Sequence, residues 1–275
     1  MVKTKKLTIP IIVILIMTLV CGIFSNNVII ANAATYGNVT CINRWTASAR
    51  KSGVILVGDS RTYGMLTNNT NFAGCGDVGG HFWHGYNNTN QSYYSSYILG
   101  KFTTVNGTSY NGSLSKLQEQ AQKTIQEVGY CHVWFFTTIN DAQMGSYFAV
   151  ANDMLTPAYK AQTWHAKYNG KTVYTKVHVV HLIPDKAKTI ATSTFTANIN
   201  NYEDSQIDKY NKKITSGNAI SKKGYAAIVN GTASYNTTYK KTHPNAKFGY
   251  SDGVHYTNDT YKVIGIWIKA VSTKY

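Results

Sequence analysis

A serine follows a short apolar strand near the start of the chain, in the pattern that presents a nucleophile. Residues 54–57 are four aliphatic residues, three of them β-branched, which predicts a buried strand that ends at Gly58. Ser60 would then lie on the turn from the carboxyl end of this strand into a helix, where nearby backbone N–H groups can face a developing oxyanion. Ser60 is therefore our candidate nucleophile.

An aspartate and a histidine near the C-terminus have the spacing that a serine nucleophile requires. Asp252 precedes His255 by three residues, and Gly253 between them eases the turn. The carboxylate can bind one imidazole nitrogen and leave the other to accept the serine proton. The sequence thus predicts a catalytic triad of Ser60, His255 and Asp252.

The ends of three neighbouring strands can supply hydrogen-bond donors for an oxyanion. Asn140 follows the apolar segment 131–137, and its side-chain amide can point to the same edge as Ser60. Gly79, with Gly80 as the alternative, follows the second predicted strand and can add a backbone N–H. We expect the oxyanion hole to consist of Ser60, Gly79 and Asn140.

Together these segments resemble the SGNH hydrolases, also called GDSL-type esterases or lipases, and in particular their secreted bacterial members. The four blocks of the family pattern match this chain at Gly58-Asp59-Ser60, Gly79, Asn140-Asp141 and Asp252-x-x-His255. Thr138 stands where the third block of the family has glycine. The resemblance covers residues 53–273 and implies a flavodoxin-like three-layer α/β/α sandwich that hydrolyses esters or thioesters without a metal or another cofactor.

Each of these residues also has a simpler interpretation when it is taken alone. Ser60 can be a helix N-cap, His255 a histidine of a surface loop, and Asn140 a residue that forms a turn. All three in this order favour the catalytic interpretation.

The order of the predicted elements favours a parallel sheet with helices on both faces. Strands are expected at residues 54–57, 72–78, 131–137, 172–183 and 225–229. Helical spacing is found at residues 61–68, 114–128, 142–167 with a break at Pro157, 207–214 and 261–268. This alternation predicts an α/β fold with a mostly parallel five-stranded sheet and a binding crevice at the carboxyl ends of its strands.

The N-terminus has the features of a secretory signal peptide. Three lysines precede an apolar run over residues 7–24, and residues 31–33 form an A-x-A cleavage site. We expect residues 1–33 to be removed, residues 34–52 to form an irregular lead-in segment, and residues 53–275 to form the hydrolase domain of a secreted or wall-associated protein. An uncleaved membrane anchor is the alternative.

The charge of the chain indicates an anionic partner. Removal of the signal segment takes away three lysines and no acidic residue, which lowers the formal charge from +15 to +12. We therefore expect electrostatic association with a polyanionic cell wall, for example with teichoic acid or an acidic polysaccharide. The lysines are scattered and form no nucleic-acid-binding module, so no specific binding of nucleic acid is expected.

Three cysteines remain in the mature chain, and an odd number leaves at least one without a disulfide. Cys131 begins an apolar strand and is expected to be a buried thiol, whereas Cys41 and Cys75 can form a bridge. None of the three has the spacing of a zinc site. His81 and His84 have no third ligand nearby in the sequence, so no metal is expected there.

Several residues beside the predicted site are candidates for substrate binding or for local structure. Arg61 can meet an anionic substrate or be paired within the fold, and Trp83 and the tyrosine-rich segment 86–97 can stack against sugar rings or pack in the core. Asp59 is expected to order the nucleophile turn. His181 is expected to make a local hydrogen bond rather than to join the triad.

These observations favour a serine esterase that removes short acyl groups, such as acetyl, from cell-wall or extracellular polysaccharide. Residues 84–113 are mostly polar, which favours a short acyl group over a long acyl chain. One alternative is an acyltransferase on the same scaffold that acts on a glycan or on teichoic acid. The other is a non-catalytic protein that binds a glycan or the cell wall.

Overall fold

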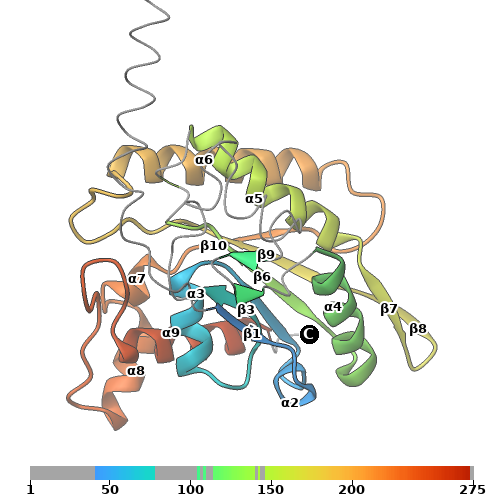
Figure 1. Ribbon diagram of the computed structural model, residues 1–275, viewed down its shortest axis with the longest axis horizontal. Helices are drawn as coiled ribbons and strands as arrows, with labels where there is room; N and C mark the ends of the chain where they lie inside the picture. Colours follow the sequence, from blue (N-terminus) through green and yellow to red (C-terminus); the bar gives the residue numbers. More distant parts are fainter. Residues whose placement is uncertain are drawn as a thin grey trace, which may run out of the picture. The chain divides into compact units, whose positions relative to one another are not determined.

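A computed structural model describes residues 41–77, 104–105, 108–109, 114–139, 142 and 146–272 (Figure 1). These residues belong to one compact unit, which spans residues 38–275. Its centre is a six-stranded sheet with the order β1-β3-β2-β6-β9-β10.

Five strands of this sheet are parallel, and one edge strand is antiparallel. The parallel strands are β2 (Val54–Val57), β3 (Ala73–Asp77), β6 (His132–Phe136), β9 (Lys176–Val180) and β10 (Ser221–Lys223), and the antiparallel one is β1 (Cys41–Arg44). Numbered along the chain, the parallel strands have the order 2-1-3-4-5, which is the flavodoxin-like order of doubly wound sheets. The predicted fold class is confirmed.

Apolar side chains of the central strands are buried on both faces of the sheet. Ile55 and Val57 of β2 pack in one hydrophobic cluster, whereas Val54 and Leu56 pack in the other, because successive side chains of a strand point to opposite faces. This two-sided burial explains why the central strands are continuous apolar runs.

Helices form the two outer layers (Figure 1). One face is covered by α4 (Leu114–Val128), α5 (Tyr147–Gln162) and α6 (Ser193–Asn211). The other face is covered by α3 (Ser60–Asn68), α7 (Ala226–Val229), α8 (Ser234–Thr242) and α9 (Asn258–Ser272). Two short hairpin pairs lie outside the sheet, namely β4 (Thr104–Val105) with β5 (Thr108–Ser109), and β7 (His165–Tyr168) with β8 (Lys171–Tyr174).

The prediction of a single strand over residues 172–183 is wrong, because this segment divides between two sheets. Its first part is β8, which pairs with β7 through a turn at Asn169-Gly170, where both residues have positive φ. Its second part is β9, which pairs with β6 in the main sheet. Thr175 separates them, and its N–H donates to the carbonyl of Trp164 at 2.9 Å.

The fifth strand also differs from the prediction. Residues 226–229 form the short helix α7, which Tyr225 precedes, and the fifth parallel strand is β10, earlier in the chain. A short apolar run does not by itself distinguish a strand from a buried helical turn. The strand β10 lies at the edge of the sheet and is half-buried, so it does not need the apolar run that marks a central strand.

Two other segments contain more regular structure than predicted. The helix α5 continues through Pro157 and is not broken there, and its buried neighbours Met154, Ala158 and Ala161 pack against the sheet. Within the expected lead-in, β1 pairs with β3 and Thr46 caps the short helix α2 (Ala47–Arg50). Among the residues that the structure describes, no helix is both long and apolar enough to cross a membrane.

Candidate active site

Ser60 lies where the sequence predicted it, on the turn that leaves β2. The N–H of Gly58 donates to the carbonyl of Cys75 at 3.2 Å, which continues the pairing with β3. Asp59 then caps α3, since its Oδ1 accepts a hydrogen bond from the Arg61 N–H at 3.0 Å. Ser60 is the first residue of α3 and is buried. The predicted role of Asp59 in ordering the turn is confirmed.

The structure brings the three residues of the predicted triad together. His255 Nε2 lies 3.0 Å from Ser60 Oγ, and His255 Nδ1 lies 2.7 Å from Asp252 Oδ2. A carboxylate at Nδ1 favours the tautomer in which Nδ1 carries the proton and Nε2 accepts one. The Ser60 hydroxyl is therefore positioned to donate its proton to His255.

A tight turn holds Asp252 beside His255. Asp252 Oδ1 accepts hydrogen bonds from the N–H groups of Val254 and His255 at 3.0 and 2.7 Å. Gly253, which directly follows Asp252, has a φ of 90°. Partial burial would raise the pKa of Asp252, but hydrogen bonds from the His255 ring and from these two N–H groups outweigh it and lower the pKa to about 2. Asp252 is thus ionised at neutral pH, as the triad requires.

Arg61 is paired within the fold, which is the second of the two roles that the sequence left open for it. Its side chain is buried and donates hydrogen bonds to the carbonyls of Val254 at 3.0 Å, Pro184 at 3.2 Å and Ile183. The guanidinium also lies 4.8 Å from the centre of the Tyr256 ring. Arg61 therefore ties the start of α3, where Ser60 lies, to the loop that carries His255.

Asp59 connects the nucleophile turn to the loop that follows β6. Its second carboxylate oxygen, Oδ2, accepts a hydrogen bond from the Ile139 N–H at 2.9 Å. The next residue in the chain is the predicted oxyanion donor Asn140.

Several predicted residues lie outside the described part of the chain and remain predictions, namely Gly79, Gly80, His81, Trp83, His84, the segment 86–97 and Asn140.

Two further carboxylates lie at the same edge of the sheet. Glu203 is fully buried and accepts hydrogen bonds from the Thr137 hydroxyl at 2.9 and 3.2 Å, and burial raises its pKa well above the ordinary value. Asp204 lies 2.8 Å from His181 Nε2, which confirms the expected local hydrogen bond of that histidine. No motif of the sequence points to Glu203, although its spacing to the buried residues Ile199 and Ile207 places it on the inner face of α6.

The cysteines are partly described. Cys131 is a buried free thiol, as expected, and burial raises its pKa. The side chain of Cys41 lies outside the described residues, so its pairing with Cys75 remains a prediction. Within the described ranges, no three His, Cys, Asp or Glu side chains are grouped so that they can hold a metal ion.

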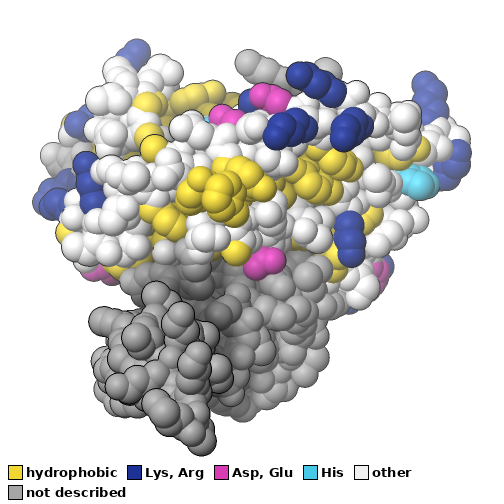
Figure 2. Space-filling view, turned by 90° about the horizontal axis from the view of Figure 1, so that it is seen from above, with side chains coloured by type: hydrophobic (Ala, Val, Ile, Leu, Met, Phe, Trp, Pro, Cys, Tyr) yellow, Lys and Arg dark blue, Asp and Glu magenta, His cyan; other side chains and the backbone are white. Residues whose placement is uncertain are grey.

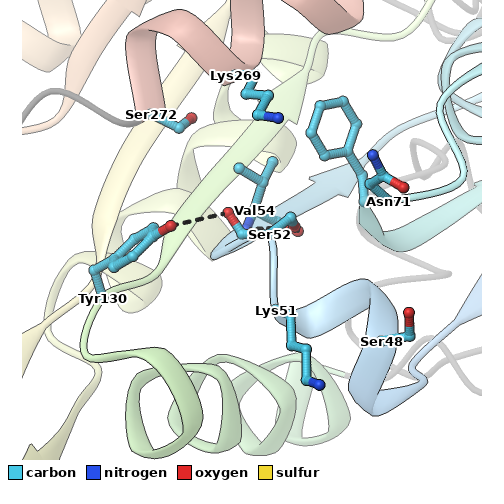
Figure 3. A pocket seen from close by; sticks show the side chains of 9 residues that line it. Ser48, Lys51, Ser52, Val54, Asn71, Tyr130, Lys269 and Ser272 are labelled. Carbon is cyan, nitrogen blue, oxygen red and sulfur yellow. Dashed lines mark hydrogen bonds between the residues drawn. The ribbon is translucent and has the colours of Figure 1, made fainter.

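A cavity of about 270 Å³ lies at the opposite edge of the sheet (Figure 3). Its lining includes Val54, which begins β2, together with Phe72 and Tyr130, which precede β3 and β6. Within this lining, the Tyr130 hydroxyl donates a hydrogen bond to the carbonyl of Ser52 at 3.3 Å (Figure 3). The cavity is thus at the amino ends of the strands, whereas Ser60 is at a carboxyl end.

No protein-family model matches this chain, and no curated protein is significantly similar to it. What the site does is therefore inferred from its geometry and its chemistry.

Proposed function

We propose that this protein is a secreted serine esterase of the SGNH type that removes short acyl groups, such as acetyl, from cell-wall or extracellular polysaccharide. One observation carries the proposal. His255 lies 3.0 Å from the Ser60 hydroxyl and 2.7 Å from Asp252, and Ser60 follows the carboxyl end of a central parallel strand. This is the arrangement of a nucleophile, its general base and the group that orients the base.

The reaction would proceed in two acyl-transfer steps. Ser60 Oγ attacks the ester carbonyl while His255 Nε2 takes the hydroxyl proton, and Asp252 stabilises the imidazolium that forms. The C–O bond to the sugar breaks as His255 gives this proton to the departing oxygen, which leaves an acyl group on Ser60. Water then attacks the acyl-enzyme while His255 takes one of its protons, and the ester bond to Ser60 breaks as His255 returns this proton to Ser60 Oγ, which releases a carboxylic acid.

The negative charge on the carbonyl oxygen requires hydrogen-bond donors. Ser60 is the first residue of α3, and N–H groups of the first helical turn have no acceptor within the helix. Its N–H can therefore face the oxyanion. We propose that the Asn140 side chain and the Gly79 N–H complete the oxyanion hole. The hydrogen bond from Ile139 to Asp59 supports this role of Asn140, because it holds the preceding residue against the nucleophile turn.

The substrate class and the location are supported by features of the sequence. The N-terminus has the pattern of a signal peptide, and the remaining chain has a formal charge of +12. Such a protein would be secreted and associate with anionic wall polymers. The polar composition of residues 84–113 supports a short acyl group.

The test is hydrolysis of p-nitrophenyl acetate and p-nitrophenyl octanoate by the purified protein. We expect the acetyl ester to have the higher kcat/KM, and Ser60→Ala to lower kcat by at least about a thousandfold. The matched control is Ser234→Ala, which removes an exposed hydroxyl from the first position of another helix, α8, and should leave kcat unchanged. A fluorophosphonate should add to Ser60 and not to the Ser60→Ala variant.

Two results would contradict the proposal in different ways. Full activity of Ser60→Ala would exclude Ser60 as the nucleophile. A preference for the octanoyl ester would leave the mechanism in place and exclude the short-chain specificity.

A further inference from the structure

Three aromatic side chains from α5 and α6 meet at one place. The ring centres of Tyr147 and Phe148 lie 4.0 Å apart, and those of Phe148 and Tyr202 lie 4.9 Å apart with an angle of 85° between the planes. Tyr147 and Tyr202 are 6.2 Å apart. We call these three residues the aromatic platform.

Phe148 is the exposed member of the platform, whereas Tyr147 and Tyr202 are half-buried. Phe148 is 46% exposed, although burial of a phenylalanine is normally favourable. The Tyr202 hydroxyl donates to Asn152 Oδ1 at 3.2 Å, which fixes the orientation of that ring. Figure 2, which looks onto the α5 and α6 side of the sheet, shows hydrophobic side chains exposed on this face among polar and basic ones.

A small hydrophobic cluster connects the platform to the candidate active site. Tyr147 and Tyr202 pack against a cluster that includes Ile139, and Val254 packs against the same cluster. Ile139 directly precedes the predicted oxyanion asparagine, and Val254 directly precedes the histidine of the triad. One hydrophobic cluster thus packs against two platform residues and against residues that adjoin the proposed chemistry.

The side chains around the platform indicate which ligand it would bind. Asn152 and Thr156 lie one and two turns along α5 from Phe148, Asn198 lies one turn before Tyr202 on α6, and all three are exposed. Asn152 Oδ1 accepts a hydrogen bond from Tyr202 and the Thr156 hydroxyl donates to the Asn152 carbonyl at 2.8 Å, which leaves the Asn152 amide N–H groups and the second lone pair of the Thr156 oxygen for a ligand. Amides and hydroxyls beside aromatic rings suit a sugar, whose C–H face packs on a ring while its hydroxyl groups form hydrogen bonds.

A lipid surface fits the two helices that form the platform less well. A helix that binds an anionic membrane carries lysines or arginines beside its apolar residues. The basic residues of α5 and α6 are Lys160 and Lys209, and both lie in the last turn of their helices. The rings of the platform lie in the first turn of α5 and in the middle of α6, away from both lysines.

We propose that the aromatic platform binds sugar rings of the polysaccharide whose ester group is at Ser60. This inference rests on the proposed esterase function and names a binding subsite for its substrate. The platform would hold the polymer beside the triad, so it would contribute to reaction with a glycan ester and not to reaction with a small ester.

Binding is measured first, in the Ser60→Ala protein, so that hydrolysis does not interfere. The probes are acetylated xylan, O-acetylated peptidoglycan fragments and acetylated chitooligosaccharide, studied by titration calorimetry. We expect Phe148→Ala to weaken binding of at least one probe by about three- to tenfold, the range for loss of one aromatic contact. Tyr202→Phe, which keeps the ring, should weaken binding less than Tyr202→Ala.

The matched control is Ile266→Ala, because Ile266 is 45% exposed and lies on α9, on the other face of the sheet. In the active protein, Phe148→Ala should lower the ratio of kcat/KM on the acetylated glycan to kcat/KM on p-nitrophenyl acetate, and Ile266→Ala should not change this ratio. Circular dichroism of each variant checks that the fold is intact.

The outcomes separate this inference from the proposed function. Glycan binding that needs Phe148, in a protein without esterase activity, supports the platform and contradicts the esterase. Esterase activity with glycan affinity that is unchanged in Phe148→Ala overturns the platform. Failure to bind any of the three glycans, or Phe148-dependent binding to phosphatidylglycerol vesicles in their place, also overturns it.

Discussion

Asp59 joins two loops that come from distant parts of the sequence. One carboxylate oxygen accepts a hydrogen bond from the Arg61 N–H in the turn at Ser60, and the other accepts one from the Ile139 N–H after β6. Arg61 makes a similar connection between α3 and the carbonyls of Ile183, Pro184 and Val254. At the scale of single residues, the geometry of the site thus depends on two charged side chains beside the nucleophile that need not contact substrate.

Replacement of Asp59 by asparagine should lower kcat more than it raises KM. An amide in the same orientation offers one acceptor and one donor, so it cannot accept both N–H groups. A buried N–H that loses its acceptor costs about 1–3 kcal/mol, and Ile139, which precedes the proposed oxyanion donor Asn140, would lose its link to the turn at Ser60. Steady-state kinetics with p-nitrophenyl acetate measures the effect. If kcat stayed at the wild-type value, the Asp59 contact would have no role in positioning that loop.

Replacement of Arg61 by lysine should destabilise the fold despite keeping the charge. An ammonium group cannot reproduce the planar set of donors that reaches three carbonyls, so buried acceptors would lose their partners. We expect the free energy of unfolding to fall by about 2–4 kcal/mol, measured by urea denaturation. An unchanged midpoint of unfolding would show that these hydrogen bonds contribute little.

At the scale of elements, the packing of α3 on β3 positions Ser60, the proposed nucleophile. The backbone of α3 approaches the strand so closely at Gly76 that no side chain fits between them. A Cβ atom there would lie 2.4 Å from the Tyr63 nitrogen and 2.8 Å from the Thr62 carbonyl carbon. These are backbone atoms of the helix that begins with Ser60, so they can move only if the helix moves.

Gly76→Ala should therefore reduce both stability and activity. Displacement of α3 should lower the free energy of unfolding by about 1–3 kcal/mol or more, and it would move Ser60 away from His255. Thermal unfolding and the rate of fluorophosphonate labelling report the two effects. The control is Gly170→Ala at the tip of the β7–β8 hairpin, where there is open space and only the backbone strain of its positive φ, about 1 kcal/mol, is expected. Equal losses in both variants would contradict the packing explanation.

At the scale of the whole molecule, the topology of the sheet determines where the site forms. The chain runs from β2 to β3 on one side and then returns to β6 on the other side of β2. Ligands of doubly wound sheets bind at such a reversal of strand order, outside the carboxyl ends of the strands. Ser60 follows β2, and Ile139, which is bonded to Asp59, follows β6.

The same sheet contains a pair of buried histidines that couples its stability to pH. His132 Nδ1 lies 2.7 Å from His178 Nε2, and His178 Nδ1 lies 2.5 Å from Ser221 Oγ, so the pair links β6, β9 and β10. Burial, followed by the charges of Lys176 and Lys223, lowers the pKa of His132 to about 4. Burial also lowers the pKa of His178 well below its ordinary value.

Stability should fall as the pH falls from about 6.5 to about 4. In this interval the unfolded chain binds protons at these histidines and the folded protein does not, so the free energy of unfolding decreases. His132 alone would account for about 3 kcal/mol at pH 4. Urea denaturation at several pH values measures the slope.

A variant with an amide in place of the imidazole tests whether the buried pair is the cause. His132→Gln removes one titrating group and should reduce the slope by about half. The control is His243→Gln, at an exposed histidine that directly follows α8, which should leave the slope unchanged. The same slope in all three proteins would exclude the buried pair as its origin.

The sequence alone was sufficient for the local features of this protein. The strand β2, the turn at Ser60 and the spacing of Asp252 and His255 involve residues a few positions apart, so residue type and periodicity predict them. The alternation of strands and helices likewise predicted the class of fold. Local hydrogen bonds and side-chain spacing hold these features in place, and both can be read directly from the sequence.

The tertiary structure decided everything that depends on contacts between distant segments. The segment 172–183 is rich in residues of high β-propensity throughout, and only the strands that it pairs with divide it between two sheets. Arginine is normally exposed, and the burial of Arg61 follows from three carbonyls more than a hundred positions away. The approach of His255 to Ser60 spans 195 positions. Propensity carries no information about such contacts, because they form only when the helices and strands pack.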